Sequence, residues 1–588
     1  MKVGAARVLA LAAIAILAAA PLWAAEFTIT LLNYIGIYAL VALGVVLLTG
    51  VAGLTSFGQA AFVGIGAYAT GWLTTVHGAS PWLGLLLALG VTGAVATLLG
   101  AVTLRLGGHF LPLGTIAWGL SLYFLFGNID ALGGHNGMTG LPPISIGSIS
   151  LEPDGAVFYV IWGALAIATI LIANLLESRQ GRAIRSLRGG AVMVESLGIS
   201  VFRIRLVTFV LAALLAAVSG WLYAHTSRFV SPAPFDVRMG IEYLFMAILG
   251  GSGYILGAVI GAALLTLLQN ALQDIVPHFT SNGSQIEVIV FAVIYVLALQ
   301  FARGGVMPFV LRYLPRGPKP AIAHAEPLPR RTLPQAGSPL LAVEGLVKRF
   351  GGLEAVSLVG FEVRAGEIVG LIGPNGAGKS TVFNLITGAL ASDDGRITFL
   401  DADITGAGQR RIAAAGIART FQHVKLRASM SLIDNVLLGT YLRTRSGLLR
   451  AALRLDRAEE ARARSEAFLQ LERVGLGANP YDQAGNLPLG RQRILEVARA
   501  LAADPALIVL DEPAAGLSRP DKLALAQLLR ALREEGVTVL LVEHDMEFVM
   551  GLVDRVVVMD FGCKLVEGPP AAVRADPRVQ EAYLGSVA

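Results

Sequence analysis

Residues 373–381 read Gly-Pro-Asn-Gly-Ala-Gly-Lys-Ser-Thr, and this run decides the fold of the C-terminal half of the chain. It fits the phosphate-binding pattern G-x-x-x-x-G-K-[ST], whose fixed positions are occupied here by Gly373, Gly378, Lys379 and Ser380. An apolar run at 367–372 predicts a strand before the loop, and residues 382–390 are compatible with a helix after it. Glycines let backbone N–H groups surround phosphate oxygens, and a helix N-terminus adds positive potential, so the stretch predicts a nucleotide-binding site.

A second motif completes the predicted nucleotide site. Residues 506–512 read Ala-Leu-Ile-Val-Leu-Asp-Glu, an apolar strand that ends in two carboxylates. We expect Asp511 to reach Mg²⁺ together with the Ser380 hydroxyl, and Glu512 to polarise an attacking water. Lys379 is expected to hold the β- and γ-phosphates. Coupled to the phosphate loop, the two acids predict hydrolysis of a nucleotide triphosphate.

The N-terminal half has the composition of a membrane domain. The chain has 588 residues, 55% of them hydrophobic, and residues 1–303 contain long apolar runs with few charges. The net charge of +5 is small for this length and forms no basic stripe, so we expect no nucleic-acid partner. The single cysteine, Cys563, excludes an internal disulfide and a cysteine-based metal site.

About ten apolar segments approach the length of about 20 residues that a helix needs to cross the hydrocarbon layer. The predicted spans are 8–25, 30–49, 56–73, 82–104, 111–127, 157–176, 207–226, 237–250, 254–273 and 286–302. Six arginines cluster between residues 179 and 205, which predicts that this loop lies in the cytoplasm. The nucleotide-binding half is then inside, and the segments outside are 74–81, 128–156, 227–236 and 274–285.

Three segments of this half leave alternatives open. Residues 1–25 form either an uncleaved helix, which the length of the apolar run favours, or a secretory signal peptide. The glycine-rich run 53–59 serves either close helix packing or a broken helix along a substrate path, with Gln59 as a polar contact. The external run 133–140 is either a gating or docking segment or a plain loop, and His135 alone makes no metal site.

The chain therefore divides into three predicted parts. Residues 1–312 form an all-α, polytopic membrane domain, and residues 313–340 form a proline-rich linker that is extended rather than packed. Strand-like and helical runs alternate over residues 341–588, which predicts an α/β nucleoside triphosphatase domain.

Residues 341–588 resemble the ATPase domain of ABC transporters. The resemblance rests on Arg-Thr-Phe-Gln at 419–422, on Leu-Pro-Leu-Gly-Arg at 487–491, where the family has LSGGQ, and on Val-Glu-His-Asp at 542–545. It implies adenine stacking by Phe350, and ATP binding by Gly373, Asn375, Gly376, Gly378, Lys379, Ser380, Thr381 and Gln422. It also implies that Gln422 joins Ser380 and Asp511 at Mg²⁺, and that His544 acts at the γ-phosphate beside the catalytic Glu512.

A narrower resemblance covers almost the whole chain except the linker. The ATPase is similar to that of branched-chain (hydrophobic) amino acid importers at 484–487, 498–501, 511–517 and 577–585. The membrane half resembles the permease of the same importers at 53–71, 133–142, 250–261 and 195–203. In that family the arginine-rich loop docks on the ATPase, which implies a coupling role for Glu195 and Gly198. Family members usually keep permease and ATPase on separate chains, so this sequence resembles a fusion.

The resemblance also implies cofactors, partners and location. ATP and Mg²⁺ are the expected cofactors, and membrane lipid surrounds the permease. The expected protein partners are a periplasmic solute-binding protein and either a second permease and ATPase subunit or a second copy of this chain. The expected location is the bacterial inner membrane with the ATPase in the cytoplasm. The solute remains open among branched-chain amino acids, other amino acids, amides and urea.

One motif departs from the family pattern. The signature segment has Pro488 and Arg491 where LSGGQ has serine and glutamine, while Leu487 and Gly490 match. In the family this segment acts on ATP held by the opposite ATPase, so the departure bears on the partner's site. A separate stretch, Arg443 to Arg473, interleaves arginines with glutamates and is interpreted as a solvated amphipathic helix rather than a binding patch.

Two other functions compete with import. An exporter also places membrane helices before an ATPase, but exporter helices usually extend far into the cytoplasm. Here the one sizeable cytoplasmic loop before the linker is 177–206. A membrane ATPase that drives a signalling or mechanical change is the second alternative, and about ten spans with tight external loops exceed what that role needs.

Overall fold

The computed structural model describes residues 2–106, 110–147, 149–151, 154–275, 304–313 and 325–584, with isolated positions 278, 289–290, 292–294, 296–297 and 300. The chain forms two compact units. The first contains residues 1–176 and 202–318, and the second contains residues 177–201 and 319–588. A short segment of the N-terminal half therefore groups with the C-terminal domain.

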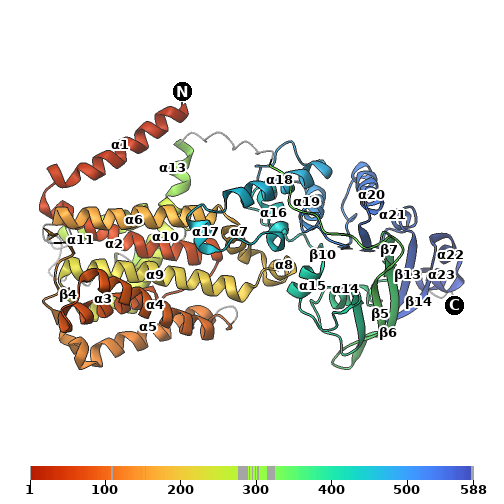
Figure 1. Cartoon of the computed structure of the whole chain (residues 1–588), viewed down its shortest axis with the longest axis horizontal. Helices are drawn as coiled ribbons and strands as arrows, with labels where there is room; N and C mark the ends of the chain where they lie inside the picture. Colours follow the sequence, from red (N-terminus) through yellow and green to blue (C-terminus); the bar gives the residue numbers. More distant parts are fainter. Residues whose placement is uncertain are drawn as a thin grey trace. The chain divides into compact units, whose positions relative to one another are not determined.

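The first unit is helical (Figure 1). Its α-helices are α1 Lys2–Trp23, α2 Glu26–Val45, α3 Gln59–Val76, α4 Pro81–Thr103, α5 Phe110–Asn128, α6 Asp154–Leu176, α9 Val201–Ser227, α10 Val237–Gly250, α11 Ile255–Ile275 and α13 Met307–Tyr313. Helix α2 packs against α6, α10 and α11, and α3 packs against α4. The buried faces are mainly apolar, as the composition predicts, with a minority of buried threonine, serine and amide side chains.

Six helices of the described chain are long and apolar enough to cross a membrane, so the predicted count of ten is not confirmed. They are Glu26–Ala52, Pro81–Thr103, Phe110–Asn128, Asp154–Leu176, Val201–Ser227 and Ile255–Ile275. Helix α10 has only 14 residues and rises about 21 Å, less than the hydrocarbon thickness. The predicted span 286–302 falls mostly outside the described residues.

The glycine-rich run 53–59 interrupts the helical path. Helix α2 continues into the π-helix η1 Val46–Ala52, and Gly53 then adopts a left-handed conformation with φ 76°. Chain 53–58 crosses to α3 and is held by a hydrogen bond from the Phe57 N–H to Thr115 Oγ1 (3.1 Å). The Gln59 side chain is fully buried, and neither of its polar atoms has a hydrogen-bond partner among the residues that the structure describes.

The predicted external run 133–140 is more ordered than a plain loop. Two 3₁₀ turns, η2 Asp130–Leu132 and η3 Gly134–Asn136, precede the short strand β1 Met138–Thr139. Strand β1 pairs antiparallel with β4 Phe229–Val230, which follows α9. Strands β2 Ser145–Ile146 and β3 Ile149–Ser150 also pair antiparallel.

The second unit is an α/β domain with two sheets, which confirms the predicted class (Figure 1). The mainly parallel sheet has the order β10-β11-β12-β7-β13-β14, and the antiparallel sheet has the order β6-β5-β8-β9. Its core strands are β7 Ile368–Ile372, β10 Ile417–Arg419, β11 Leu507–Asp511, β12 Thr538–Val542, β13 Arg555–Asp560 and β14 Cys563–Gly568. The antiparallel strands are β5 Pro339–Phe350, β6 Leu353–Arg364, β8 Asp394–Phe399 and β9 Ala402–Asp403.

Helices surround these sheets and form a separate helical cluster. The helices that follow strands are α14 Lys379–Ile386, α15 Gln409–Ala415, α20 Arg519–Glu534, α21 Met546–Met550, α22 Pro570–Ala575 and α23 Pro577–Leu584. Helices α16 Leu432–Leu437, α18 Arg457–Arg473 and α19 Leu489–Leu501 pack around their own apolar core. Parallel strands β7, β11 and β12 are buried along their full lengths, because α14 and the antiparallel sheet cover one face and helices cover the other.

The linker differs from the expectation of an unpacked tether. Residues 314–324 lie outside the described residues, but residues 325–338 run without helix or strand along the ATPase. Leu328 is 6% exposed within the core of the helical cluster, and its carbonyl accepts a hydrogen bond from Arg443 Nη2 (3.1 Å). Arg331 Nη1 donates to the Ala415 carbonyl (2.7 Å). The apolar side chains of Leu328 and Leu333, together with these hydrogen bonds, fix this stretch.

Candidate functional site

The phosphate-loop motif forms a turn that only glycine can make at its first position. Strand β7 ends at Ile372, and Gly373 follows with φ 151°. A Cβ at Gly373 would lie 2.1 Å from the Met559 carbonyl oxygen, so no other residue fits. Helix α14 begins at Lys379, and its N-cap, Gly378, supplies no side-chain acceptor. The first N–H groups of the helix therefore remain available to an anion.

Lys379 lies folded back over the same loop. Its ammonium donates hydrogen bonds to the Gly373 carbonyl (2.7 Å) and the Pro374 carbonyl (2.8 Å). Burial lowers the pKa of Lys379, while the carboxylates of Glu512 and Asp511 act in the opposite direction. The ammonium is thus held at the loop by neutral acceptors, which leaves its charge to be matched by phosphate.

Asp511 has the features of a cation ligand. It ends β11, its residue is 7% exposed, and its buried Oδ1 accepts no hydrogen bond from any part of the chain that the structure describes. Burial raises the pKa of Asp511 to about 6, although the nearby Arg419 guanidinium opposes that rise. A buried carboxylate oxygen without a donor fits a divalent cation, which supplies the missing positive charge.

The other ligands of a cation at Asp511 would be groups other than carboxylates. In the part of the chain that the structure describes, no three His, Cys, Asp or Glu residues are grouped to hold a metal. The predicted ligands Ser380 and Gln422 carry a hydroxyl and an amide, and both are exposed to solvent. This donor set of neutral oxygens with one carboxylate is typical of Mg²⁺ that shares its coordination with phosphate and water.

Glu512 lies next to two other predicted site residues, Gln422 and His544, which come from distant parts of the sequence. Its Oε1 accepts a hydrogen bond from Gln422 Nε2 (3.3 Å) and lies 3.8 Å from His544 Nδ1. The Glu512 side chain is 25% exposed, so water reaches it. Its backbone has φ 48°, a left-handed conformation that costs a non-glycine residue about 1–3 kcal/mol and is found mainly at functional sites.

Glu543 belongs to this cluster and carries no predicted role. Its side chain is buried and accepts hydrogen bonds from the N–H groups of Ala514 (2.7 Å) and His544 (3.2 Å). Burial raises the pKa of Glu543, and these backbone donors act against the rise. Glu543 thus joins the segment after Glu512 to the segment that carries His544. The signal available in the sequence was an acid at the end of an apolar strand, one position before His544.

Two arginines from other elements, Arg419 and Arg493, make hydrogen bonds near the predicted nucleotide site. Arg419, at the end of β10, donates from Nη1 to Thr387 Oγ1 (2.6 Å) and from Nη2 to Asn384 Oδ1 (3.2 Å). Burial lowers the pKa of Arg419 to about 10. Arg493, on α19, donates from Nη1 to the Glu512 carbonyl (2.8 Å). Neither side chain was predicted to have a role.

The other residues predicted to contact the nucleotide lie outside the cluster around Glu512. Phe350 ends β5, is 47% exposed, and has the Lys348 ammonium 5.7 Å from its ring centroid. Asn375 and Gly376 are exposed in the phosphate loop, and Thr381 lies in the first turn of α14. An exposed ring at a strand end is free to stack on a planar base.

The signature segment leads into α19. Pro488 is the N-cap of this helix and offers no side-chain acceptor. Gln492 Nε2 donates to the Leu487 carbonyl (2.8 Å), which closes the turn. Gly490 lies against Leu517, and Arg491 is exposed. The permanent charge of Arg491 therefore faces solvent in this chain.

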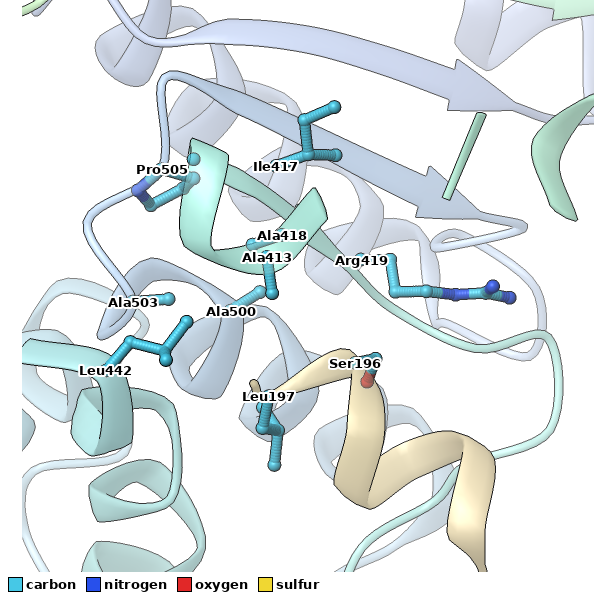
Figure 2. Close-up of a pocket in the computed structure, with 11 residues that line it drawn as sticks. Ser196, Leu197, Ala413, Ile417, Ala418, Arg419, Leu442, Ala500, Ala503 and Pro505 are labelled. Carbon is cyan, nitrogen blue, oxygen red and sulfur yellow. The ribbon is translucent and has the colours of Figure 1, made fainter. Parts of the chain in front are cut away.

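The segment 177–201 folds as part of the ATPase unit. It contains α7 Arg179–Ser186, the 3₁₀ turn η4 Leu187–Gly189 and α8 Ala191–Ser196. Helix α8 packs against α15, and Figure 2 shows Leu197 at its end, close to Leu442 and the small side chains of Ala413 and Ala500. A Cβ at Gly198 (φ 79°) would lie 2.4 Å from the Leu442 side chain. Glu195 is half-buried on α8, and its carbonyl accepts the Gly198 N–H (2.9 Å).

A cluster of charged groups fixes α7 to α18 and the preceding loop. Arg182 makes two hydrogen bonds to Glu460, and the Arg179 N–H donates to Glu460 Oε1 (2.7 Å). The Arg179 guanidinium lies 3.7 Å from the Tyr441 ring centroid and donates to the Ser446 carbonyl (3.2 Å). The interpretation of α18 as a solvated helix is therefore wrong for Glu460. It is also wrong for Glu466, which is buried beside Arg443, because partners from elsewhere in the sequence cover them.

Comparison with known proteins identifies both halves. The family model "Branched-chain amino acid transport system / permease component" matches residues 27–299, and "ABC transporter" matches residues 356–515. A third model, "Branched-chain amino acid ATP-binding cassette transporter", matches residues 563–588. The high-affinity branched-chain amino acid transport ATP-binding protein LivG of Salmonella typhimurium is 45% identical over 250 residues, which are 42% of this chain and 98% of LivG.

The chain belongs to the branched-chain amino acid ABC transporter family. A second relative, BraF of Pseudomonas aeruginosa, a high-affinity branched-chain amino acid transport ATP-binding protein, is 41% identical over 42% of this chain and 98% of its own length. A crystal structure of a nucleotide-free ATP-binding cassette from an ABC transporter is 33% identical, covers 42% of this chain and 100% of its own, and aligns with a TM-score of 0.38. In this ABC transporter chain, permease and ATPase are fused, as the sequence predicted, and ATP hydrolysis is coupled to transport.

Proposed function

We propose that this ABC transporter chain imports branched-chain amino acids at the expense of ATP. The observation that carries the proposal is the joint presence of both components on one chain. The permease model and the ATP-binding relatives are each drawn from branched-chain amino acid systems. The exporter and the signalling ATPase have no comparable support, since both halves point independently to the same class of importer.

In the proposed ATPase cycle, Lys379 and the phosphate loop hold the β- and γ-phosphates. Glu512 accepts the proton of the attacking water, because it is the partly exposed carboxylate of the cluster and already lies beside His544 and Gln422. His544 is 60% exposed and is free to reach the γ-phosphate. Phe350 stacks on the adenine. Hydrolysis is achieved mainly by positioning and electrostatics, as in other phosphoryl transfers.

Mg²⁺ is proposed as the cofactor at Asp511. The unpaired, buried Oδ1 of Asp511 supports this assignment, with the Ser380 hydroxyl and the Gln422 amide as further ligands. When bound, the cation neutralises phosphate charge. The chain itself contributes the oxygen ligands and keeps Asp511 at the end of a rigid buried strand.

Residues 177–201 are proposed to transmit nucleotide-driven movement to the permease. Helix α8 packs on α15, and β10 follows α15 directly and leads to Gln422. The Thr420 hydroxyl on this path accepts a hydrogen bond from the Asp511 N–H (3.2 Å). A displacement of the β10–Gln422 segment when ATP binds therefore has a short, packed route to Glu195 and Gly198.

The complete transporter is proposed to require further subunits. A periplasmic binding protein delivers the amino acid, and a second permease and ATPase, or a second copy of this chain, closes the two nucleotide sites. The bacterial inner membrane is the proposed location, with the ATPase in the cytoplasm.

The test is ATP-dependent uptake of labelled leucine, isoleucine and valine into sealed vesicles that contain the complete transporter. We expect accumulation that requires ATP and is lost in the Glu512→Gln variant. Accumulation of an unrelated solute without any of the three amino acids would contradict the proposed substrate. Outward transport of leucine would contradict import.

A further inference from the structure

Glu242 is an acid placed well inside a permease helix. It is the sixth residue of α10, whereas the other acids in the described α-helices of the first unit, Glu26, Asp154 and Asp274, lie in a first or last turn. A charged side chain away from a helix end is costly in a membrane and is usually retained for function. Glu242 therefore requires an explanation beyond helix formation.

The two oxygens of Glu242 have different partners. Oε2 accepts a hydrogen bond from Gln269 Nε2 on α11 (2.9 Å), and Oε1 accepts from Arg238 Nε one turn earlier on α10 (3.2 Å). The Glu242 side chain is 12% exposed, whereas that of Arg238 is 63% exposed. Gln269 holds the carboxylate from inside, and Arg238 reaches it from the solvent-accessible side.

Aromatic rings lie on the inner side of this pair. Tyr243 is buried next to Glu242 on α10, and its ring centroid lies 5.9 Å from that of Tyr38 on α2. Tyr38 in turn lies 5.8 Å from Tyr34, one helical turn away. The carboxylate of Glu242 is within electrostatic range of both Tyr38 and Tyr243. Tyrosine faces attract cations and also provide apolar area.

We propose that Arg238 and Glu242 form a binding site for the zwitterionic head of an amino acid, a proposal that rests on the proposed import function. The ammonium group binds the Glu242 carboxylate, and the carboxylate binds the Arg238 guanidinium. The apolar side chain lies against Tyr34 and Tyr38. The internal ion pair is thus exchanged for two ion pairs with the substrate.

This exchange is energetically accessible. An ion pair with one strongly exposed partner contributes little to stability, so opening the Arg238–Glu242 pair costs little. The guanidinium offers two parallel donors to a carboxylate, a better match than the single contact that it makes with Glu242. Gln269 keeps the Glu242 carboxylate in place while Arg238 moves. On the predicted topology, α10 starts and α11 ends at the external side, where substrate arrives.

The experiment measures equilibrium binding of tritiated leucine to the purified full-length chain in lipid nanodiscs, without a soluble binding protein. Two analogues act as competitors: 3-methylbutylamine, which lacks the carboxylate, and 4-methylpentanoate, which lacks the ammonium group. Glu242→Gln is expected to weaken leucine binding about tenfold or more, since a charge-assisted hydrogen bond is lost. The amine should then stop competing while the acid still competes, and Arg238→Gln should give the opposite pattern.

Asp274→Asn is the matched control, because it removes one acid from the neighbouring helix α11 at an exposed position. It should leave leucine affinity unchanged. If Glu242→Gln lowers the thermal unfolding midpoint, Glu242→Asp keeps the charge and should retain competition by the amine. Unchanged leucine affinity in Glu242→Gln would overturn the inference.

Different experimental results would overturn the inference and the proposed function. If the complete transporter accumulates leucine but the wild-type chain alone does not bind it, the inference is overturned and the proposed function stands. If the complete transporter does not accumulate leucine, the proposed function itself is overturned.

Discussion

Arg182 and Glu460, which are 278 positions apart, form a two-point ion pair inside the ATPase unit. Arg182 Nη1 lies 2.8 Å from Glu460 Oε2, and Nη2 lies 2.9 Å from Oε1. The side chains are 2% and 16% exposed, so solvent hardly screens them. Arg182 lies on α7, which the sequence connects to permease helices on both sides. The pair therefore fastens a permease-derived segment to the α18 helix of the ATPase.

We predict that reversing either charge of this pair uncouples the transporter. Arg182→Glu or Glu460→Arg leaves a buried charge without a partner, which costs about 3–5 kcal/mol. ATP-driven leucine uptake should fall by more than tenfold, and the double swap Arg182→Glu/Glu460→Arg should regain much of it. Arg457→Glu, an exposed reversal in the first turn of α18, is the control. Normal uptake in both single variants would contradict a coupling role for α7.

Two substitutions in the nucleotide site should affect ATP hydrolysis and ATP binding separately. Glu512→Gln removes the proposed base while the phosphate loop stays intact, so turnover should fall about 10²–10⁴-fold with ATP affinity retained. Lys379→Ala removes the ammonium that lies over the loop, so ATP affinity itself should fall. Filter binding and single-turnover hydrolysis in the complete complex measure the two quantities. Wild-type hydrolysis by Glu512→Gln would show that the base is elsewhere.

Mg²⁺-dependent ATP binding should weaken in acid. Asp511 has a pKa raised to about 6 by burial, and its protonated form offers no charge to a cation. Affinity should therefore be constant above pH 7 and fall about tenfold at pH 5, one unit below that pKa. Titrations with Mg²⁺ and with EDTA across pH 5–8 isolate the effect. Asp511→Asn should bind Mg²⁺ and ATP weakly at every pH, without the loss of affinity in acid, and an unchanged loss in acid would assign it to another group.

The unpaired amide of Gln59 should destabilise the permease. A buried polar group without a partner costs about 1–3 kcal/mol, so Gln59→Met is expected to raise the thermal unfolding midpoint. Thr92→Val is the matched change, because the Thr92 hydroxyl on α4 is also buried and unpaired. If Gln59 serves the substrate path, only Gln59→Met should reduce leucine uptake. Equal uptake in both variants would assign Gln59 to packing alone.

Pro488→Ser should act on both stability and the partner's nucleotide site. Pro488 is the N-cap of α19 and provides no acceptor, whereas a serine there caps a helix at a gain of about 0.5–2 kcal/mol. The same hydroxyl would also be available to ATP on the opposing ATPase. With Arg491→Gln added, single-turnover hydrolysis at that site should become faster. Pro488→Ala, which supplies no hydroxyl, is the control, and equal rates in the two variants would contradict the role of the signature.

The nucleotide-binding fold could be predicted because its signals are local. The phosphate loop and the strand ending at Asp511 are each written in one short run of residues, and parallel strands then bring these runs to one edge of a sheet. Glu512, Gln422 and His544 meet there for the same reason. Glu543 escaped prediction because its role consists of accepting backbone N–H groups, which no side-chain pattern encodes.

Contacts between distant segments could not be predicted. Apolar runs indicated helices but did not fix which of them cross the membrane: ten spans were predicted, and six of the described helices are long and apolar enough to do so. Glu460 and Glu466 on α18 looked solvated because their arginine partners, Arg182 and Arg443, lie elsewhere in the sequence. The packing of residues 325–338 was missed because prolines gave the dominant signal, and Leu328 and Leu333 are isolated apolar residues among polar ones.

The division of the chain into units has a consequence for how the fused protein could have arisen. The backbone passes between the units three times, at 176–177, at 201–202 and at 318–319. Only the last passage lies in the linker, because the first two enclose residues 177–201, which fall within the permease half of the sequence. A chain cut between residues 318 and 325 would still hold its halves together through the segment 177–201. Covalent continuity then ensures equal numbers of the two halves.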